Sequence, residues 1–155
     1  MTQELLYKEF TYKIFNCAIY ISGIYKNKEK VKPLGLTSAE LHERFKQDLT
    51  ERLKKEGFYV KPEKYFYRPE GKDLINSKLQ WRRSDLLVKD KEPGYIVLIE
   101  IKCGNDDTLS NEKVKRQNEA QVLNTLEYAG LKLCMILQMK NDSTYKITQK
   151  RKIIS

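Results

Sequence analysis

The sequence of residues 83–102 reads RSDLLVKDKEPGYIVLIEIK, and this stretch decides the expected fold. Its segments 83–89 and 95–102 are rich in Leu, Ile and Val, and Pro93-Gly94 lies between them. Apolar runs separated by a Pro-Gly turn are typical of two strands that pair with each other. We therefore expect a β-hairpin here.

Three charged side chains interrupt this apolar hairpin. Asp85 comes early in the first strand, and Glu100 and Lys102 come late in the second, so pairing brings all three to the same edge. Because side chains two positions apart share a face of a strand, Glu100 and Lys102 point the same way. Charges that follow the run Ile-Val-Leu-Ile are costly to bury unless they are paired or bind a metal.

This arrangement predicts a metal-dependent hydrolytic site. The carboxylates of Asp85 and Glu100 are the hard oxygen ligands that Mg²⁺ or Mn²⁺ prefers, and they leave positions open for water and a phosphate oxygen. Lys102 can orient or deprotonate the attacking water and stabilise the developing charge. The alternative is a strand-end salt bridge between Glu100 and Lys102. The Glu-x-Lys pattern is common in a chain that is 33% charged, and it occurs again at Glu70-Gly-Lys72.

The clearest helix is expected at residues 38–56. Thr37 and Glu40 form the pattern of a capping box at its start, and Gly57 supplies a stop. Its apolar residues recur every four positions and make one stripe that faces the core. They are Leu41, Phe45, Leu49 and Leu53.

His42 is the only histidine of the chain. At ~100° per residue it lies beside Leu41 within the apolar stripe, so we expect it to point inward. As a metal ligand it would favour Mn²⁺ or another transition metal over Mg²⁺, because imidazole is a softer donor than carboxylate. A hydrogen-bonded core histidine is the alternative.

Other segments show periodicities of their own. Residues 4–24 predict an amphipathic helix, although their β-branched and aromatic content leaves a hairpin as the alternative. A further helix is expected at residues 112–129, ended by Gly130. Strands are expected at residues 58–67 and 132–139.

The remaining segments predict loops and a basic tail. Loops are expected at residues 26–35 and 69–77, and residues after Asn141 form an edge strand or a loose tail. The order ααβββαβ predicts an α/β (α+β) fold with a mixed central sheet flanked by helices. We expect one domain: an N-terminal helix and basic loop (1–36), a catalytic core (37–140) and the tail (141–155).

The charge of the chain predicts a polyanionic partner. Thirty Lys and Arg stand against 21 Asp and Glu, which gives a net charge of +9, and this favours nucleic acid through phosphate contacts. A solvated lysine-rich surface is the alternative. The helix expected at residues 112–129 carries Gln117 and Gln121 on one face, and the alternative there is a solvated polar face without a ligand. The residues that we expect to contact nucleic acid are Lys28, Lys30, Arg82, Arg83, Gln117 and Gln121.

Cysteine usage and hydropathy predict the location. Cys17, Cys103 and Cys134 are scattered singly, without zinc-ligand spacing, which fits a reducing cytoplasmic setting. No stretch approaches the roughly 18 apolar residues of a membrane span, so no membrane partner is expected.

Four sequence blocks carry a resemblance to a known family. They are LLYKEFTYKIFNCA (5–18), RSDLLV (83–88), IEIK (99–102) and AQVLNTL (120–126). On these blocks the chain resembles, from about Leu5 to Met139, the GxxExxY family of the PD-(D/E)XK nuclease superfamily, whose core is restriction-endonuclease-like. The resemblance implies that Asp85 and Glu100 bind metal, that Lys102 is catalytic and that Gln121 is the helix glutamine of RecB-like nucleases.

The motif that names this family differs here. His42 stands where its Glu belongs and Phe45 where its Tyr belongs. RecB-like and cap-snatching nucleases are similar to this arrangement, with a helix histidine as metal ligand. The resemblance therefore implies His42 as a ligand and leaves an inactive enzyme as the alternative.

Together these features predict a nuclease that cuts phosphodiester bonds with one or two Mn²⁺ or Mg²⁺ ions. Asp85, Glu100 and His42 would hold the metal, and the carbonyl of Ile101 would complete the shell. An endonuclease is favoured, and DNA is favoured over RNA. The alternative is an inactive protein of the same fold that binds nucleic acid or a protein partner. A homodimer is left open.

Overall fold

The computed structural model describes residues 2–67, 81–92 and 94–154. Its centre is a five-stranded mixed sheet in the order β1-β4-β5-β6-β7. The strands are β1 (Tyr59–Pro62), β4 (Leu86–Lys89), β5 (Ile96–Gly104), β6 (Leu133–Lys140) and β7 (Ile147–Ile153). The pair β5–β6 is parallel, and the other neighbours are antiparallel. This sheet and its helices confirm the predicted α/β class.

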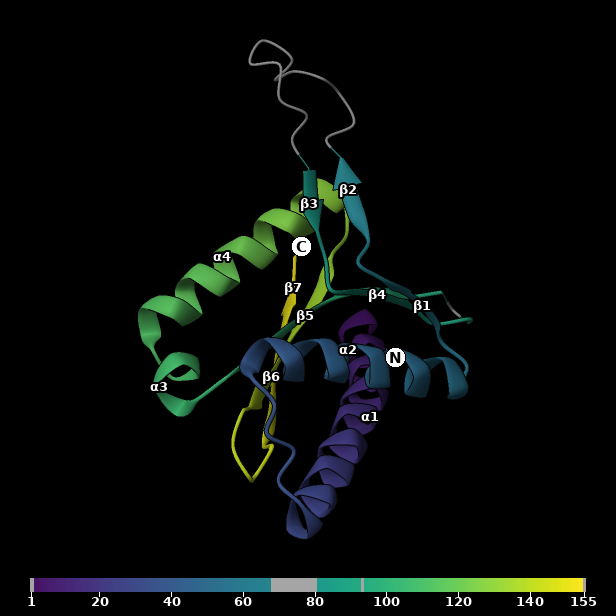
Figure 1. Ribbon diagram of the computed structural model, residues 1–155. Helices are drawn as coiled ribbons and strands as arrows, with labels where there is room; N and C mark the ends of the chain where they lie inside the picture. The colour runs from purple at the N-terminus through teal and green to yellow at the C-terminus, as the bar shows by residue number, and fades with distance from the viewer. Residues whose placement is uncertain (1, 68–80, 93, 155) are drawn as a thin grey trace.

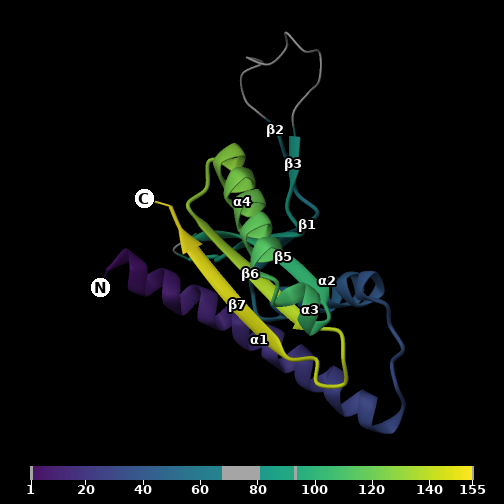
Figure 2. The same ribbon diagram turned by 90° about the vertical axis from the view of Figure 1, so that its left-hand side faces the viewer.

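Helices cover both faces of the sheet. The helices α1 (Gln3–Val31) and α2 (Ser38–Lys55) pack on one face, and α4 (Glu112–Ala129) packs on the other, after the short α3 (Asp106–Leu109). Figure 2 shows the sheet between α1 and α4. None of the helices in the described ranges is long and apolar enough to cross a membrane.

Alternation along β5 assigns its side chains to the two faces. Val97, Ile99 and Ile101 belong to the core cluster with α1 and α2, whereas Leu98 packs with Leu126 of α4. Because successive side chains alternate, Glu100 and Lys102 lie on the face that α4 covers.

The long helix α1 corrects one prediction. It runs to Val31, so the segment 26–31 is helical although we expected a loop from residue 26, and the hairpin alternative for the N-terminal segment is wrong. Lys and Glu are good helix formers, and basic residues in the last turn complement the helix dipole. The helix ends because Lys32 precedes Pro33 and adopts an extended conformation (φ −155°, ψ 129°).

The local signals of α2 and α4 are confirmed. Thr37 and Glu40 make the reciprocal hydrogen bonds of a capping box. Gly130 closes α4 in the left-handed conformation, with φ 67°. The basic tail forms the edge strand β7, and the short helix α3 was not predicted.

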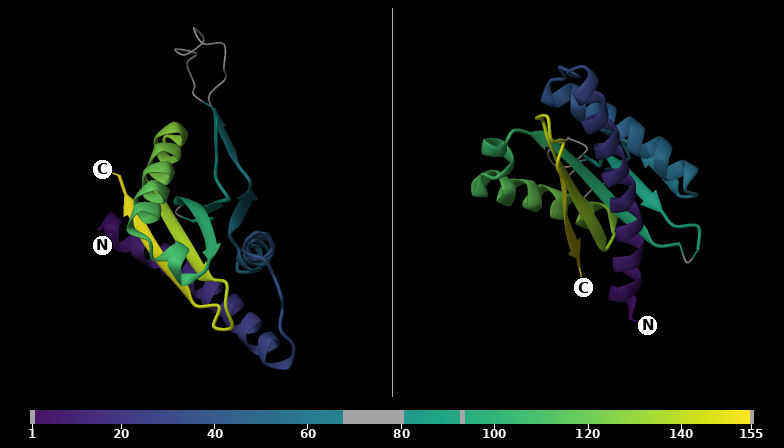
Figure 3. Two further views of the ribbon diagram at one scale, coloured as in Figure 1. Left: turned by 60° about the vertical axis from the view of Figure 1, so that its left-hand side comes forward. Right: turned by 90° about the horizontal axis from the view of Figure 1, so that it is seen from below.

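Two predicted strands are broken. Residues 58–67 divide into β1 and β2 (Tyr65–Tyr67) at Glu63, which has φ 52°, and residues 83–89 divide into β3 (Trp81–Arg83) and β4. The two breaks face each other, because the N–H of Glu63 donates to the carbonyl of Asp85 at 2.8 Å. The antiparallel β2–β3 hairpin therefore stands away from the main sheet beside α4 (Figures 1 and 3). The loop predicted at residues 69–77 lies outside the described residues.

The packing of the core predicts that two Leu→Ala substitutions in the helices have different effects on the free energy of unfolding. Leu49 on α2 is 0% exposed and Leu5 on α1 is 44% exposed. Leu49→Ala should lower the free energy of unfolding by about 2–5 kcal/mol, because it leaves a cavity. Leu5→Ala should lower it by about 0.5 kcal/mol or less. Urea denaturation followed by circular dichroism measures both, and equal effects would contradict this packing.

Candidate active site

The site lies in a fork between β4 and β5. Their ladder ends at the pair Leu86 and Ile99, and beyond it the side chain of Asp85 takes the place of the next backbone partner. The N–H of Ile101 donates to Asp85 Oδ2 at 2.8 Å. Asp85 is 6% exposed, so this bond fixes its carboxylate against the backbone of β5.

Glu100 lies next to Asp85 and accepts a hydrogen bond from its backbone. The N–H of Asp85 donates to Glu100 Oε1 at 3.3 Å. Burial and the negative charge of Asp85 raise the pKa of Glu100 to about 8. Burial also acts to raise the pKa of Asp85, but the hydrogen bonds from His42 and from the N–H of Ile101 outweigh it and keep that pKa below its usual value. Without a bound cation, the pair therefore carries about one negative charge at neutral pH.

His42 points toward these carboxylates, as its helical angle predicts. Its Nε2 lies 3.3 Å from Asp85 Oδ2, and its ring is partly exposed. The hydrogen bond with Asp85 is the main cause that raises the pKa of His42, and burial opposes it. The structure places His42 beside Asp85 and hydrogen-bonded to it, and this position is compatible with both interpretations of His42.

Most of the predicted site residues line one open hollow of about 680 Å³. The predicted residues that line it are His42, Arg83, Asp85, Glu100, Ile101, Lys102 and Gln121. Gln117 is exposed on α4 and Lys28 and Lys30 are exposed in the last turn of α1, and none of the three lines the hollow. Arg82 belongs to β3, and its side chain lies outside what the structure describes.

The salt-bridge alternative for Glu100 and Lys102 is not formed. The ion pairs made by the described residues include neither side chain. Lys102 is close enough for its charge to lower the pKa of Glu100, but burial and Asp85 outweigh it. Lys102 therefore faces the hollow without an ion-pair partner among the described residues.

A buried lysine supports the site and was not predicted. Lys46 is 4% exposed, and its Nζ lies 2.7 Å from Glu63 Oε1 and 3.0 Å from Glu43 Oε2. Since the N–H of Glu63 donates to the carbonyl of Asp85, Lys46 ties α2 to the strand break that carries Asp85. The sequence does contain a signal for Lys46: it follows His42 by four positions, so the two residues share one face of the helix.

The donor set suits a hard divalent cation, although the chain alone forms no closed cage. In the described ranges, no three His, Cys, Asp or Glu side chains form a group that could hold a metal ion. Two carboxylates and an imidazole are nevertheless present within the hollow. The N–H and C=O of one strand residue point to the same side, so the carbonyl of Ile101 also faces the fork. A cation there would offset the repulsion between Asp85 and Glu100.

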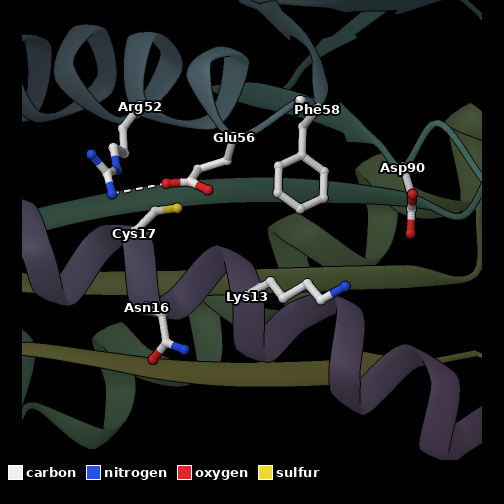
Figure 4. Close-up of a pocket in the computed structure, with 8 residues that line it drawn as sticks. Lys13, Asn16, Cys17, Arg52, Glu56, Phe58 and Asp90 are labelled. Carbon is white, nitrogen blue, oxygen red and sulfur yellow. Dashed lines mark ion pairs between the residues drawn. The ribbon is translucent and has the colours of Figure 1, made fainter.

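A second hollow, of about 480 Å³, lies between α1 and the C-terminal end of α2 (Figure 4). Arg52 pairs there with Glu56 at 2.8 Å, beside Cys17. None of the predicted site residues lines it. Its mixed charges balance locally, so we do not assign the predicted chemistry to it.

Comparison with known proteins supports the fold alone. No protein-family model and no curated protein matches the sequence. The crystal structure of SSO0001 is similar with a TM-score of 0.52 and 18% sequence identity, over 88% of this chain. The chain spans 62% of the SSO0001 chain. The class that fold and site define is thus a mixed α/β protein with a carboxylate-lined hollow at a strand fork.

The single histidine makes the His42–Asp85 contact directly measurable. In metal-free protein the pKa of His42 should lie above its ordinary value, and Asp85→Asn should lower it because the hydrogen-bonded carboxylate is lost. NMR titration of the imidazole protons measures both. Asp90→Asn, at the other end of β4, is the matched control and should leave that pKa unchanged. An equal pKa in wild type and Asp85→Asn would rule the contact out.

Proposed function

We propose that this protein is a divalent-metal-dependent nuclease of the PD-(D/E)XK class that hydrolyses phosphodiester bonds of nucleic acid. One observation carries the proposal: Asp85 and Glu100 meet in the β4–β5 fork with Lys102 on the same strand face as Glu100. The resemblance of four sequence blocks to the GxxExxY family supports it. So does the net charge of +9, which attracts a polyanion.

The roles follow from position. Asp85, Glu100, the carbonyl of Ile101 and His42 would hold Mn²⁺ or Mg²⁺, and the imidazole favours Mn²⁺. When bound, such an ion lowers the pKa of a coordinated water and offsets charge on the phosphate. Lys102 orients or deprotonates the attacking water and stabilises the negative charge that develops.

Other lining residues would position the substrate. Arg83 can pair with a backbone phosphate, and the amide of Gln121 on α4 can bind a phosphate oxygen or orient Lys102. The hollow is open rather than enclosed, which supports entry of an uninterrupted strand and therefore an endonuclease. DNA remains the favoured substrate.

A second candidate function is an inactive protein of this fold that binds nucleic acid or a protein partner. It is favoured by the pairing of His42 with Asp85, since the two groups satisfy each other without a cation. Isothermal titration of Mn²⁺ into the protein separates the two, because an inactive binder should have no saturable metal site.

Cleavage tests the nuclease directly. Lys102→Ala should lower the cleavage rate by about 100-fold or more, because the proton-transfer group is lost, while Mn²⁺ affinity is retained. Lys132→Ala, immediately before β6 and outside the hollow, should cleave like wild type. Labelled single- and double-stranded DNA and RNA are incubated with Mn²⁺ or Mg²⁺ and resolved on denaturing gels. The proposal fails if wild type leaves all four substrates uncut.

Thermal stability tests the metal ligands without relying on activity. Mn²⁺ that binds only the folded state should stabilise wild type by about 2.7 kcal/mol at a hundredfold excess over Kd, and EDTA should reverse the effect. His42→Ala and Asp85→Ala should show a smaller rise in Tm. Gln117→Ala, outside the hollow, is the control. A rise that is equal in all four proteins would place the ion elsewhere.

A further inference from the structure

One end of the α4 face of the sheet is left open. Val122 and Leu126 of α4 pack on Leu98, Cys134 and Ile136, which belong to β5 and β6. In Figure 1, β1 and β4 extend to the opposite side of the β2–β3 hairpin from α4. The outer part of this sheet face therefore has no helix above it among the described residues.

Cross-strand register defines what this open face presents. Tyr59, Lys89 and Ile96 form one row across β1, β4 and β5, and Lys61 and Leu87 form part of the next. Directly opposed residues of antiparallel strands share a face. These five side chains line a hollow of about 470 Å³, together with Lys54 near the end of α2.

The floor of this hollow is apolar and one wall is aromatic. Leu87 and Ile96 are partly buried, and Tyr59 is 57% exposed. Tyr59 is held by the β1–β4 pairing, so its ring is presented by a strand rather than by a loop. An exposed tyrosine beside an apolar floor is suited to a flat ring that stacks or packs.

The charged side chains that line the hollow have one sign. Its lining includes Lys54, Lys61 and Lys89 and no acidic side chain. The ion pairs of the described residues include none of these three lysines. Lys91 adds a fourth cation, with its Nζ 5.3 Å from the centre of the Tyr59 ring. The complementary ligand is therefore anionic and carries flat apolar groups.

We propose that this hollow binds single-stranded nucleic acid, with a base stacked on Tyr59 and packed over Leu87 and Ile96. The lysines contact the flanking phosphates. The choice of nucleic acid over an acidic peptide rests on the proposed nuclease function, because it makes the ligand the same molecule as the substrate. Binding here needs neither metal nor chemistry.

The position of the hollow relative to the active site supports this assignment. Ile96 and Glu100 lie on the same face of β5 and are four residues apart, which at ~3.3 Å per residue is about 13 Å. The β2–β3 hairpin leaves the sheet at the N-terminal end of β4, next to Asp85, and Lys89 lies at the other end of that strand. A single nucleic-acid strand bound at both the active site and the Tyr59 hollow would keep its scissile bond near Lys102 while a neighbouring base stacks on Tyr59.

Fluorescence anisotropy with a labelled oligothymidylate in EDTA measures binding without cleavage. Tyr59→Ala should weaken binding about 5- to 150-fold, because a stacked base is lost. Tyr12→Ala, which removes a tyrosine 61% exposed on α1, is the matched control and should bind like wild type. Lys61→Ala with Lys89→Ala should lower the slope of log affinity against log salt by about 0.7 per lysine. Lys113→Ala with Lys132→Ala should leave it unchanged.

Three results would overturn the assignment. They are equal affinity of Tyr59→Ala and Tyr12→Ala, an unchanged salt slope in the lysine variant, and displacement of the oligonucleotide by polyglutamate at equal charge concentration. The last would indicate a site for acidic polypeptides. Failure of the nuclease proposal is distinguishable, because it is an absence of cleavage with Mn²⁺ by a protein that still binds the oligonucleotide through Tyr59.

Discussion

The hydrogen bond from the N–H of Ile101 to the carboxylate of Asp85 is the constraint on which the site depends. A ladder between β4 and β5 would normally continue past Leu86 and Ile99, but here a side chain replaces the next backbone acceptor. Because the Asp85 side chain takes this place, β4 and β5 separate in a fork, and the chain before Asp85 leaves the main sheet for the β2–β3 hairpin. Asp85 and Glu100 remain as neighbours, since the N–H of Asp85 donates back to Glu100. Backbone and site geometry thus have the same origin.

Much of the fold could be predicted because its signals are local. The capping box of α2, Gly94 between β4 and β5 with φ 88°, and Gly130 after α4 each act within a few residues. The strand breaks could not be predicted in this way. Glu63 and Asp85 are 22 positions apart in the sequence, and each break is defined by its hydrogen bond to the other. Neither segment contains a residue pattern that marks the bend.

The site could be predicted in part for a similar reason. The inward direction of His42 follows from helix geometry, and the shared face of Glu100 and Lys102 follows from strand alternation. Gln117 and Gln121 share a helix face, yet only Gln121 lines the hollow, because reach depends on where α4 crosses the sheet. Lys46 would be expected in water on charge alone. Its burial depends on Glu63, which arrives from a distant strand.

The cost of this arrangement supports a role beyond stability. A fold selected for stability alone would place an apolar residue at position 100, where burial and the charge of Asp85 disfavour an ionised carboxylate. A pairing of Glu100 with Lys102 would reduce that cost, but the two side chains form no ion pair in the described part of the chain. Glu100 buried beside Asp85, together with a lysine that has no ion-pair partner among the described residues, is therefore costly for the protein without a ligand. A cation and a phosphate would offset these costs together, because the cation balances the acids and the phosphate balances Lys102.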